Sequence, residues 1–147
     1  MQTVADTTTR ANLIARITQL NTNSPAQWGK MSVDQMLKHC RLWEEMALGR
    51  LTTKRVFIGR IFGRIALRSI LKNEAPLTRS TPTAPEILVT GHSNADNEKT
   101  KWIGLLEEYA VPVDTYIIHP FFGKMTREQL GYMSYKHADH HLRQLNS

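Results

Sequence analysis

The chain has 147 residues, of which 22% are charged and 41% are hydrophobic, a balance typical of a folded globular domain. This composition excludes collagen-like, low-complexity and wholly disordered chains. At this length we expect a single domain over residues 1–147, large enough to bury a core. Nineteen Lys and Arg residues against thirteen Asp and Glu residues give a formal charge of +6, which permits an anionic partner without requiring one.

The cysteine content and the N-terminus indicate where the protein works. A single cysteine, Cys40, excludes an intramolecular disulfide and favours a reducing compartment. Residues 1–10 lack the apolar core of a secretory signal. No apolar run approaches the ~18 residues that a membrane-spanning helix requires. We therefore expect a cytoplasmic protein with no membrane partner.

Four segments have the apolar periodicity of long helices. They are, in chain order, residues 7–20, 32–50, 95–110 and 126–145. Two of them also carry a capping-box pattern at the start, Ser32 with Gln35 and Thr126 with Gln129. These boundary signals predict where the second and the last long helix begin.

A fifth stretch, residues 57–71, predicts an extra helical piece with basic side chains at every fourth position. This basic row consists of Arg60, Arg64, Arg68 and Lys72. Pro76, Pro82 and Pro85 follow closely and exclude a continuous helix over residues 73–85. The extra piece therefore belongs to a long crossover between the second and third long helices.

Two other segments connect the helices. Residues 86–90 predict a short extended run, and Tyr116–Phe122 predicts an apolar connector interrupted by Pro120 and closed by Gly123. No convincing set of alternating strands is present. We predict an all-α fold, a four-helix bundle with the long crossover between helices two and three.

Three histidines form the candidate metal site. His137 and His141 are four residues apart on the predicted last helix, so their rings share one face and can converge on one metal ion. His39 lies at the edge of the inward stripe of the second helix and supplies a third ligand if the two helices are neighbours. Three imidazoles leave a coordination position for water or substrate, as in catalytic zinc sites. The alternative is that these histidines are core residues satisfied by hydrogen bonds.

Other residues near these motifs suggest supporting roles. Trp43 is one helical turn from His39 and is placed to wall the site. His140 points about 100° away from His141 and is predicted as a polar flank or a supporting residue. Cys40 is predicted as a small core residue. Glu44 and Glu45 follow His39 by five and six residues, but neither is clearly aimed at the metal, so no general base is identifiable.

His119 lies in a loop about seven residues before the last helix, and His137 lies some 16 Å along that helix from its start, so a shared set of ligands is not expected. We predict a structural role in which Phe121 and Phe122 plug one end of the bundle, with a place at the pocket mouth as the alternative. His92 is predicted to be solvated.

Three separated motifs resemble those of the DinB-like superfamily, in the same order along the chain. Residues 28–32 (WGKMS) and 36–39 (MLKH) look like its second-helix motif. Residues 135–144 (YKHADHHLRQ) look like its last-helix motif. Residues 119–126 (HPFFGKMT) are similar to a branch of the superfamily with no assigned function.

The resemblance implies a four-helix bundle with an up-down-down-up arrangement and a divalent metal held by His39, His137 and His141. By ligand type, three imidazoles suit Zn, Ni or Fe, and Cu as well. Some members of the superfamily are transferases or isomerases that use a low-molecular-weight thiol. Others are metal-dependent hydrolases, and many have no known substrate.

These observations leave two functional hypotheses. The first is a metal-dependent hydrolase or thiol-dependent transferase acting on a small molecule. The second is a non-enzymatic binding protein that uses the basic row at residues 60–72 for an anionic partner. Nucleic acid is disfavoured as that partner because only Phe57 and Phe62 interleave the basic side chains. Gly59 and Gly63 are spaced for close helix approach, but the arginines argue against a membrane-spanning helix. Whether the protein forms a homodimer is left open.

Overall fold

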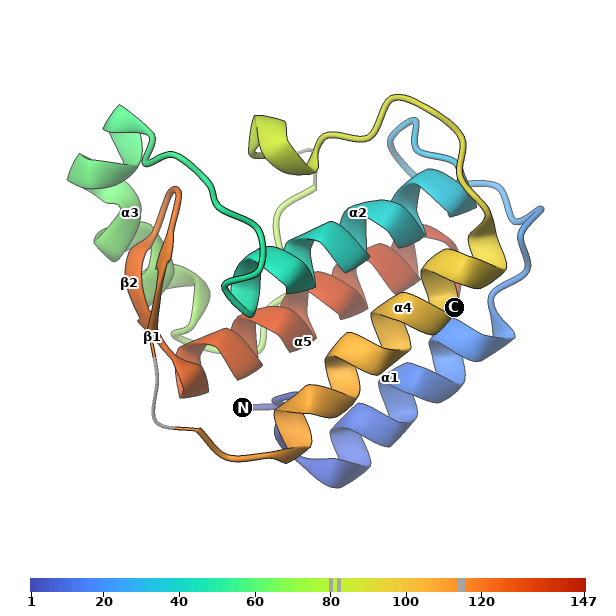
Figure 1. The fold of residues 1–147 in the computed structure, drawn as a ribbon, viewed down its shortest axis with the longest axis horizontal. Helices are drawn as coiled ribbons and strands as arrows, with labels where there is room; N and C mark the ends of the chain where they lie inside the picture. Colours follow the sequence, from blue (N-terminus) through green and yellow to red (C-terminus); the bar gives the residue numbers. More distant parts are fainter. Residues whose placement is uncertain (80, 82, 114–115) are drawn as a thin grey trace.

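The computed structural model describes residues 1–79, 81, 83–113 and 116–147, which are mostly helical with one small sheet (Figure 1). The α-helices are α1 (Thr7–Gln19), α2 (Val33–Ala47), α3 (Phe57–Ile70), α4 (Ala95–Glu107) and α5 (Arg127–Gln144). Two short 3-10 helices, η1 (Pro85–Ile87) and η2 (Glu108–Ala110), and two strands, β1 (Tyr116–His119) and β2 (Gly123–Thr126), complete the set. None of the helices in these ranges is both long and apolar enough to cross a membrane.

The helices begin where the sequence predicts. Ser32 and Thr126 cap α2 and α5, and in both the predicted capping box is present. In α5 the backbone N–H of Thr126 donates to Gln129 Oε1 at 3.1 Å. Asp6 caps α1 by accepting from the backbone N–H of Thr9 at 2.7 Å. Each cap satisfies backbone donors that a helix start leaves without partners.

The four helices α1, α2, α4 and α5 enclose the core (Figure 1). Contacts join α1 to α4, α4 to α2, α2 to α5 and α5 to α1. The largest fully buried side chains come from all four helices and include Leu13, Ile17, Met36, Leu37, Trp102, Leu106, Leu130 and Leu142. This packing brings α2 and α5 together although they are some ninety residues apart in the chain, which is the condition for a site between them.

The prediction of a purely helical fold was wrong at the segment before α5. Strands β1 and β2 form an antiparallel hairpin in which Tyr116 pairs with Thr126 and His119 with Gly123. Pro120 lies in the turn and not in a strand, so its missing N–H costs no ladder hydrogen bond. Gly123 closes the turn with a φ of +82°, a conformation that glycine adopts without strain.

The crossover between α2 and α4 holds a second correction. Residues 86–90 were expected to be extended, but Pro85–Ile87 forms the 3-10 helix η1. Proline at its first position suits a helix start, because that N–H would have no helical partner. Pro82 lies outside the described residues.

Helix α3 packs against the hairpin at one end of the molecule (Figure 1). Gly59 and Gly63 lie so close to the backbone of Phe121 that a Cβ at either position would clash with its carbonyl oxygen. Arg55 Nη1 adds a hydrogen bond to the His119 carbonyl at 2.8 Å. The close approach that the glycine spacing indicates is present, and its partner is the hairpin turn.

Candidate metal centre

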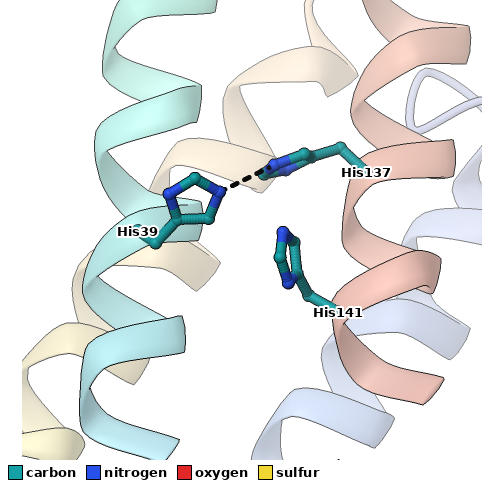
Figure 2. A group of neighbouring side chains, drawn as sticks. All are labelled: His39, His137 and His141. Carbon is teal, nitrogen blue, oxygen red and sulfur yellow. Dashed lines mark hydrogen bonds between the residues drawn. The ribbon is translucent and has the colours of Figure 1, made fainter. Parts of the chain in front are cut away.

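The three predicted histidines meet in the interior between α2 and α5. Figure 2 shows the His39 ring on α2 facing the His137 and His141 rings on α5. His39 Nε2 and His137 Nε2 are 3.1 Å apart, and one ring nitrogen from each residue lies within 4.8 Å of the others. The side chains are buried, with exposed fractions of 5%, 8% and 7%. The structure therefore places all three in one cluster that could hold a metal ion.

Two of the rings are oriented by hydrogen bonds on the side away from the cluster. His39 Nδ1 donates to the Ile87 carbonyl of η1 at 2.9 Å. His141 Nδ1 donates to Gln144 Oε1 at 2.8 Å, and Gln144 Nε2 donates to the Trp28 carbonyl at 2.8 Å. Both acceptors are oxygens without a proton to give, so each Nδ1 carries the hydrogen and each Nε2 keeps its lone pair. Such bonds are the usual outer support of histidine ligands to a metal.

The third ring is positioned by an aromatic side chain. Trp43 lies one turn after His39 on α2 and stacks on His137, with ring centroids 4.8 Å apart and an interplanar angle of 20°. Trp43 is itself buried. It walls the cluster as the sequence predicts and restricts the His137 ring to one orientation.

Burial keeps the imidazoles neutral. It lowers the pKa of His39, and it lowers the pKa of His137 well below its ordinary value with help from the neighbouring imidazoles. For His141 the same causes bring the pKa to about 3. Neutral imidazoles present the lone pairs that a metal ion needs, with no proton to displace at pH 7.

The donor set fits a divalent transition metal. Zinc binds histidine nitrogen at about 2.0–2.1 Å with tetrahedral angles, which corresponds to roughly 3.3 Å between two ligand nitrogens. The 3.1 Å between His39 Nε2 and His137 Nε2 is close to that spacing. Imidazole suits Zn, Fe, Ni and Cu, whereas Ca and Mg prefer oxygen ligands.

A buried carboxyl group lies about one turn from the histidines, and sequence reasoning did not predict its burial. Glu44 on α2 is 1% exposed and accepts hydrogen bonds from Ser134 Oγ on α5 and from the Tyr109 hydroxyl, the latter at 3.0 Å. Burial raises its pKa to about 7. Glu44 follows Cys40 by four residues and precedes Ala47 by three, so its place on the buried stripe was a signal that could have found it.

A cavity of about 330 Å³ lies beside the cluster, between the crossover, residues 27–28 and the end of α5. Its walls include Trp28, Arg79, His140 and Arg143. The His140 ring centroid is 5.1 Å from that of His141 and 5.4 Å from the Trp28 ring. The Arg79 guanidinium lies 4.1 Å above the Trp28 ring. His140 is therefore the cavity-lining residue whose ring lies beside that of His141, while the three clustered histidines are not among the residues that line the cavity.

The remaining candidates lie away from the cluster. His119 Nδ1 accepts hydrogen bonds from the backbone N–H groups of Phe121 and Phe122 at 3.1 and 3.2 Å, which stabilises the hairpin turn. Burial lowers its pKa to about 4, so the ring is a neutral acceptor. Cys40 is fully buried in the core, and His92 is exposed beside Asp34.

Comparison with known proteins identifies the family of the chain but no individual relative. No curated protein and no solved structure gives a significant match to the chain. Residues 5–147 match the family described as "Protein of unknown function (DUF1569)", so the match covers nearly the whole chain, including all three histidines. The chain therefore belongs to the DUF1569 family.

Proposed function

We propose that His39, His137 and His141 bind one divalent metal ion and that the protein is a metal-dependent enzyme acting on a small molecule. The observation that carries the proposal is the orientation of the rings. The Nδ1 atoms of His39 and His141 donate hydrogen bonds to oxygens on the outer side of the cluster. Their Nε2 lone pairs therefore face the interior that they share with His137.

The alternative of satisfied core histidines fits less well. Among the described residues, the inward Nε2 of His141 makes no hydrogen bond, and the Nε2 of His39 has only His137. A metal ion satisfies these nitrogens together, so the burial of the rings favours a ligand-binding role.

The packing also supports a DinB-like bundle. The closed series of contacts among α1, α4, α2 and α5 is what a four-helix bundle requires. The histidines lie on the second and last of these helices, as the resemblance implies for that superfamily. In this proposal DUF1569 is a branch of the DinB-like superfamily.

A divalent metal ion would supply Lewis acidity and a lowered pKa for a bound water or thiol. The chain's own residues would orient the reactants. Trp43 covers one side of the cluster and excludes water there. Arg79, Arg143 and His140 line the adjacent cavity and suit an anionic group, on the substrate or on a low-molecular-weight thiol. A cytoplasmic location belongs to the same proposal.

The metal half of the proposal is tested by elemental analysis of the purified protein after incubation with Zn, Ni or Fe at neutral pH. We expect one ion per chain in the wild type and loss of binding in His39→Ala and His141→Ala. His92→Ala is the matched control, because His92 is exposed and should leave the stoichiometry unchanged. A wild type that takes up no stoichiometric metal contradicts the proposal.

The catalytic half is tested by screening ester, amide and electrophilic small molecules with metal-loaded and chelator-treated protein. Turnover without added thiol indicates a hydrolase, and turnover that requires a thiol indicates a transferase. The activity must disappear in His39→Ala and survive in His92→Ala. Metal binding without any metal-dependent turnover across the screen would reduce the protein to a metal-binding module.

A further inference from the structure

Helix α3 presents a large apolar surface to solvent, on the side opposite its attachment to the hairpin. Five side chains on this outward face are between 53% and 77% exposed. They are Phe57, Ile58, Ile61, Phe62 and Ile65, and we call them the outer stripe. Their spacing keeps them on one helix face, while Gly59, Gly63 and Leu67 are buried on the other. Exposed apolar stripes of this kind mark interaction surfaces.

A strongly basic region borders the outer stripe. Residues 50–72 contain seven Lys or Arg residues and no Asp or Glu. Arg60, Arg64 and Arg68 are exposed and, by helical spacing, line one edge of the stripe, and Lys72 is exposed just after the end of α3. Ion pairs among the described residues do not involve these four side chains. Their charge is available to an anionic partner.

The partner must therefore be both apolar and anionic. A second copy of the chain would bring the same basic row beside the stripe and oppose like charges. Nucleic acid would use the arginines but would leave five large apolar side chains without a role. The surface of a bilayer that contains anionic phospholipids accepts both features at once.

We propose that α3 docks the protein on an anionic phospholipid surface, with the outer stripe in the headgroup–acyl boundary and the basic row among the headgroups. Fourteen helical residues span about 21 Å, less than the ~30 Å hydrocarbon core, so α3 lies in the plane of the surface. This departs from the expectation of no membrane partner, which depended on the lack of a spanning helix. The proposal is independent of the metal centre.

The geometry of α3 allows variants that change the outer face alone. Ile61→Gln with Ile65→Gln removes apolar area from two exposed positions, and Leu88→Gln with Val111→Gln is the matched control because both residues are 62% exposed elsewhere. Arg60→Gln with Arg68→Gln removes two charges. Arg64 is left in place because it donates to the Lys124 carbonyl at 2.9 Å. Lys30→Gln with Lys101→Gln is the charge control, at two exposed positions on other elements.

The experiment is co-sedimentation of the full chain with vesicles of phosphatidylcholine alone or mixed with phosphatidylglycerol. We expect binding to the mixed vesicles, weakening with added salt, and little binding to phosphatidylcholine alone. Each α3 double variant should lower the partition coefficient roughly tenfold or more, and both controls should bind as the wild type does. Thermal melts of the variants should match the wild type, because the substituted side chains are exposed.

Three results would overturn the proposal. The first is no binding of the wild type to mixed vesicles. The second is binding that the α3 double variants retain in full. The third is a wild-type dimer in sedimentation velocity that Ile61→Gln with Ile65→Gln dissociates, without vesicle binding, which would assign the outer stripe to a second copy of the chain.

Discussion

Two buried polar clusters lie one helical turn apart between α2 and α5, and they differ in how they are satisfied. In the first, the Glu44 carboxyl group accepts from two hydroxyl groups, and the protein alone completes it. In the second, His39 and His141 use outward nitrogens for the protein, and ring nitrogens of all three histidines face one another. Buried polarity therefore does not by itself mark a ligand site. Ring nitrogens that converge with too few protein partners do.

The largest expected effect is the gain in unfolding free energy on metal binding, which should depend on the histidine cluster and not on the Glu44 cluster. Metal at about a thousand times its dissociation constant should raise the free energy of unfolding of the wild type by roughly 4 kcal/mol. His137→Ala should lose this gain, because it removes a ligand. Ser134→Ala should keep it, because Ser134 serves only Glu44. Urea unfolding with and without metal measures both, and an equal gain in His137→Ala would contradict the assignment.

The second prediction uses the pKa of Glu44, which burial raises from 4.5 to about 7. Folded protein retains the proton over this range while the unfolded chain releases it, so the carboxyl's contribution to stability falls as pH rises from 4.5 to 7. Relative to Glu44→Gln, the metal-free wild type should lose about 3 kcal/mol of unfolding free energy over this pH range.

The histidines have the opposite sign, since their lowered pKa values make the folded state less stable as pH falls. Subtracting the Glu44→Gln profile removes their contribution, because that variant keeps all three rings. A difference between the two unfolding profiles that does not change with pH would show that Glu44 is ionised in the fold at every pH tested.

The third prediction concerns the outer support of the histidine cluster. Gln144→Ala removes the acceptor of His141 Nδ1 and the link to the Trp28 carbonyl. Losing such support typically lowers metal affinity 10–100-fold. Competition with a chromophoric chelator measures the affinity, and Gln27→Ala is a control on the adjacent cavity wall. Unchanged affinity would mean that helix packing alone orients the ring.

The smallest expected effect is that of Trp43→Phe. The substitution keeps an aromatic ring beside His137 but reduces the stacked area, so we expect a loss of metal affinity below about tenfold and a stability loss of about 1 kcal/mol. The same chelator competition and urea unfolding measure the two quantities. A loss as large as that of Gln144→Ala would show that stacking matters as much as hydrogen bonding for the geometry of the site.

Local sequence signals were sufficient for the helices and for the identity of the histidines. Caps and apolar periodicity act over one or two turns, so Ser32, Thr126 and the stripe of each helix located the elements. The i, i+4 spacing of His137 and His141 is likewise a property of one helix. The hairpin was not predicted, because its strands have only four residues each and because Pro120 was taken to interrupt the segment when it lies in the turn.

The sequence by itself determined which residues form helices and which imidazoles share a face, because both depend on neighbours within a few positions. Only the tertiary structure decided that α2 lies against α5, that the Ile87 carbonyl holds His39, and that Glu44 is enclosed by hydroxyls from two other elements. It also decided that α3 turns its glycines to the hairpin and its large apolar side chains to solvent. These are contacts between residues distant in the chain, and their free energy depends on the packing of the whole molecule.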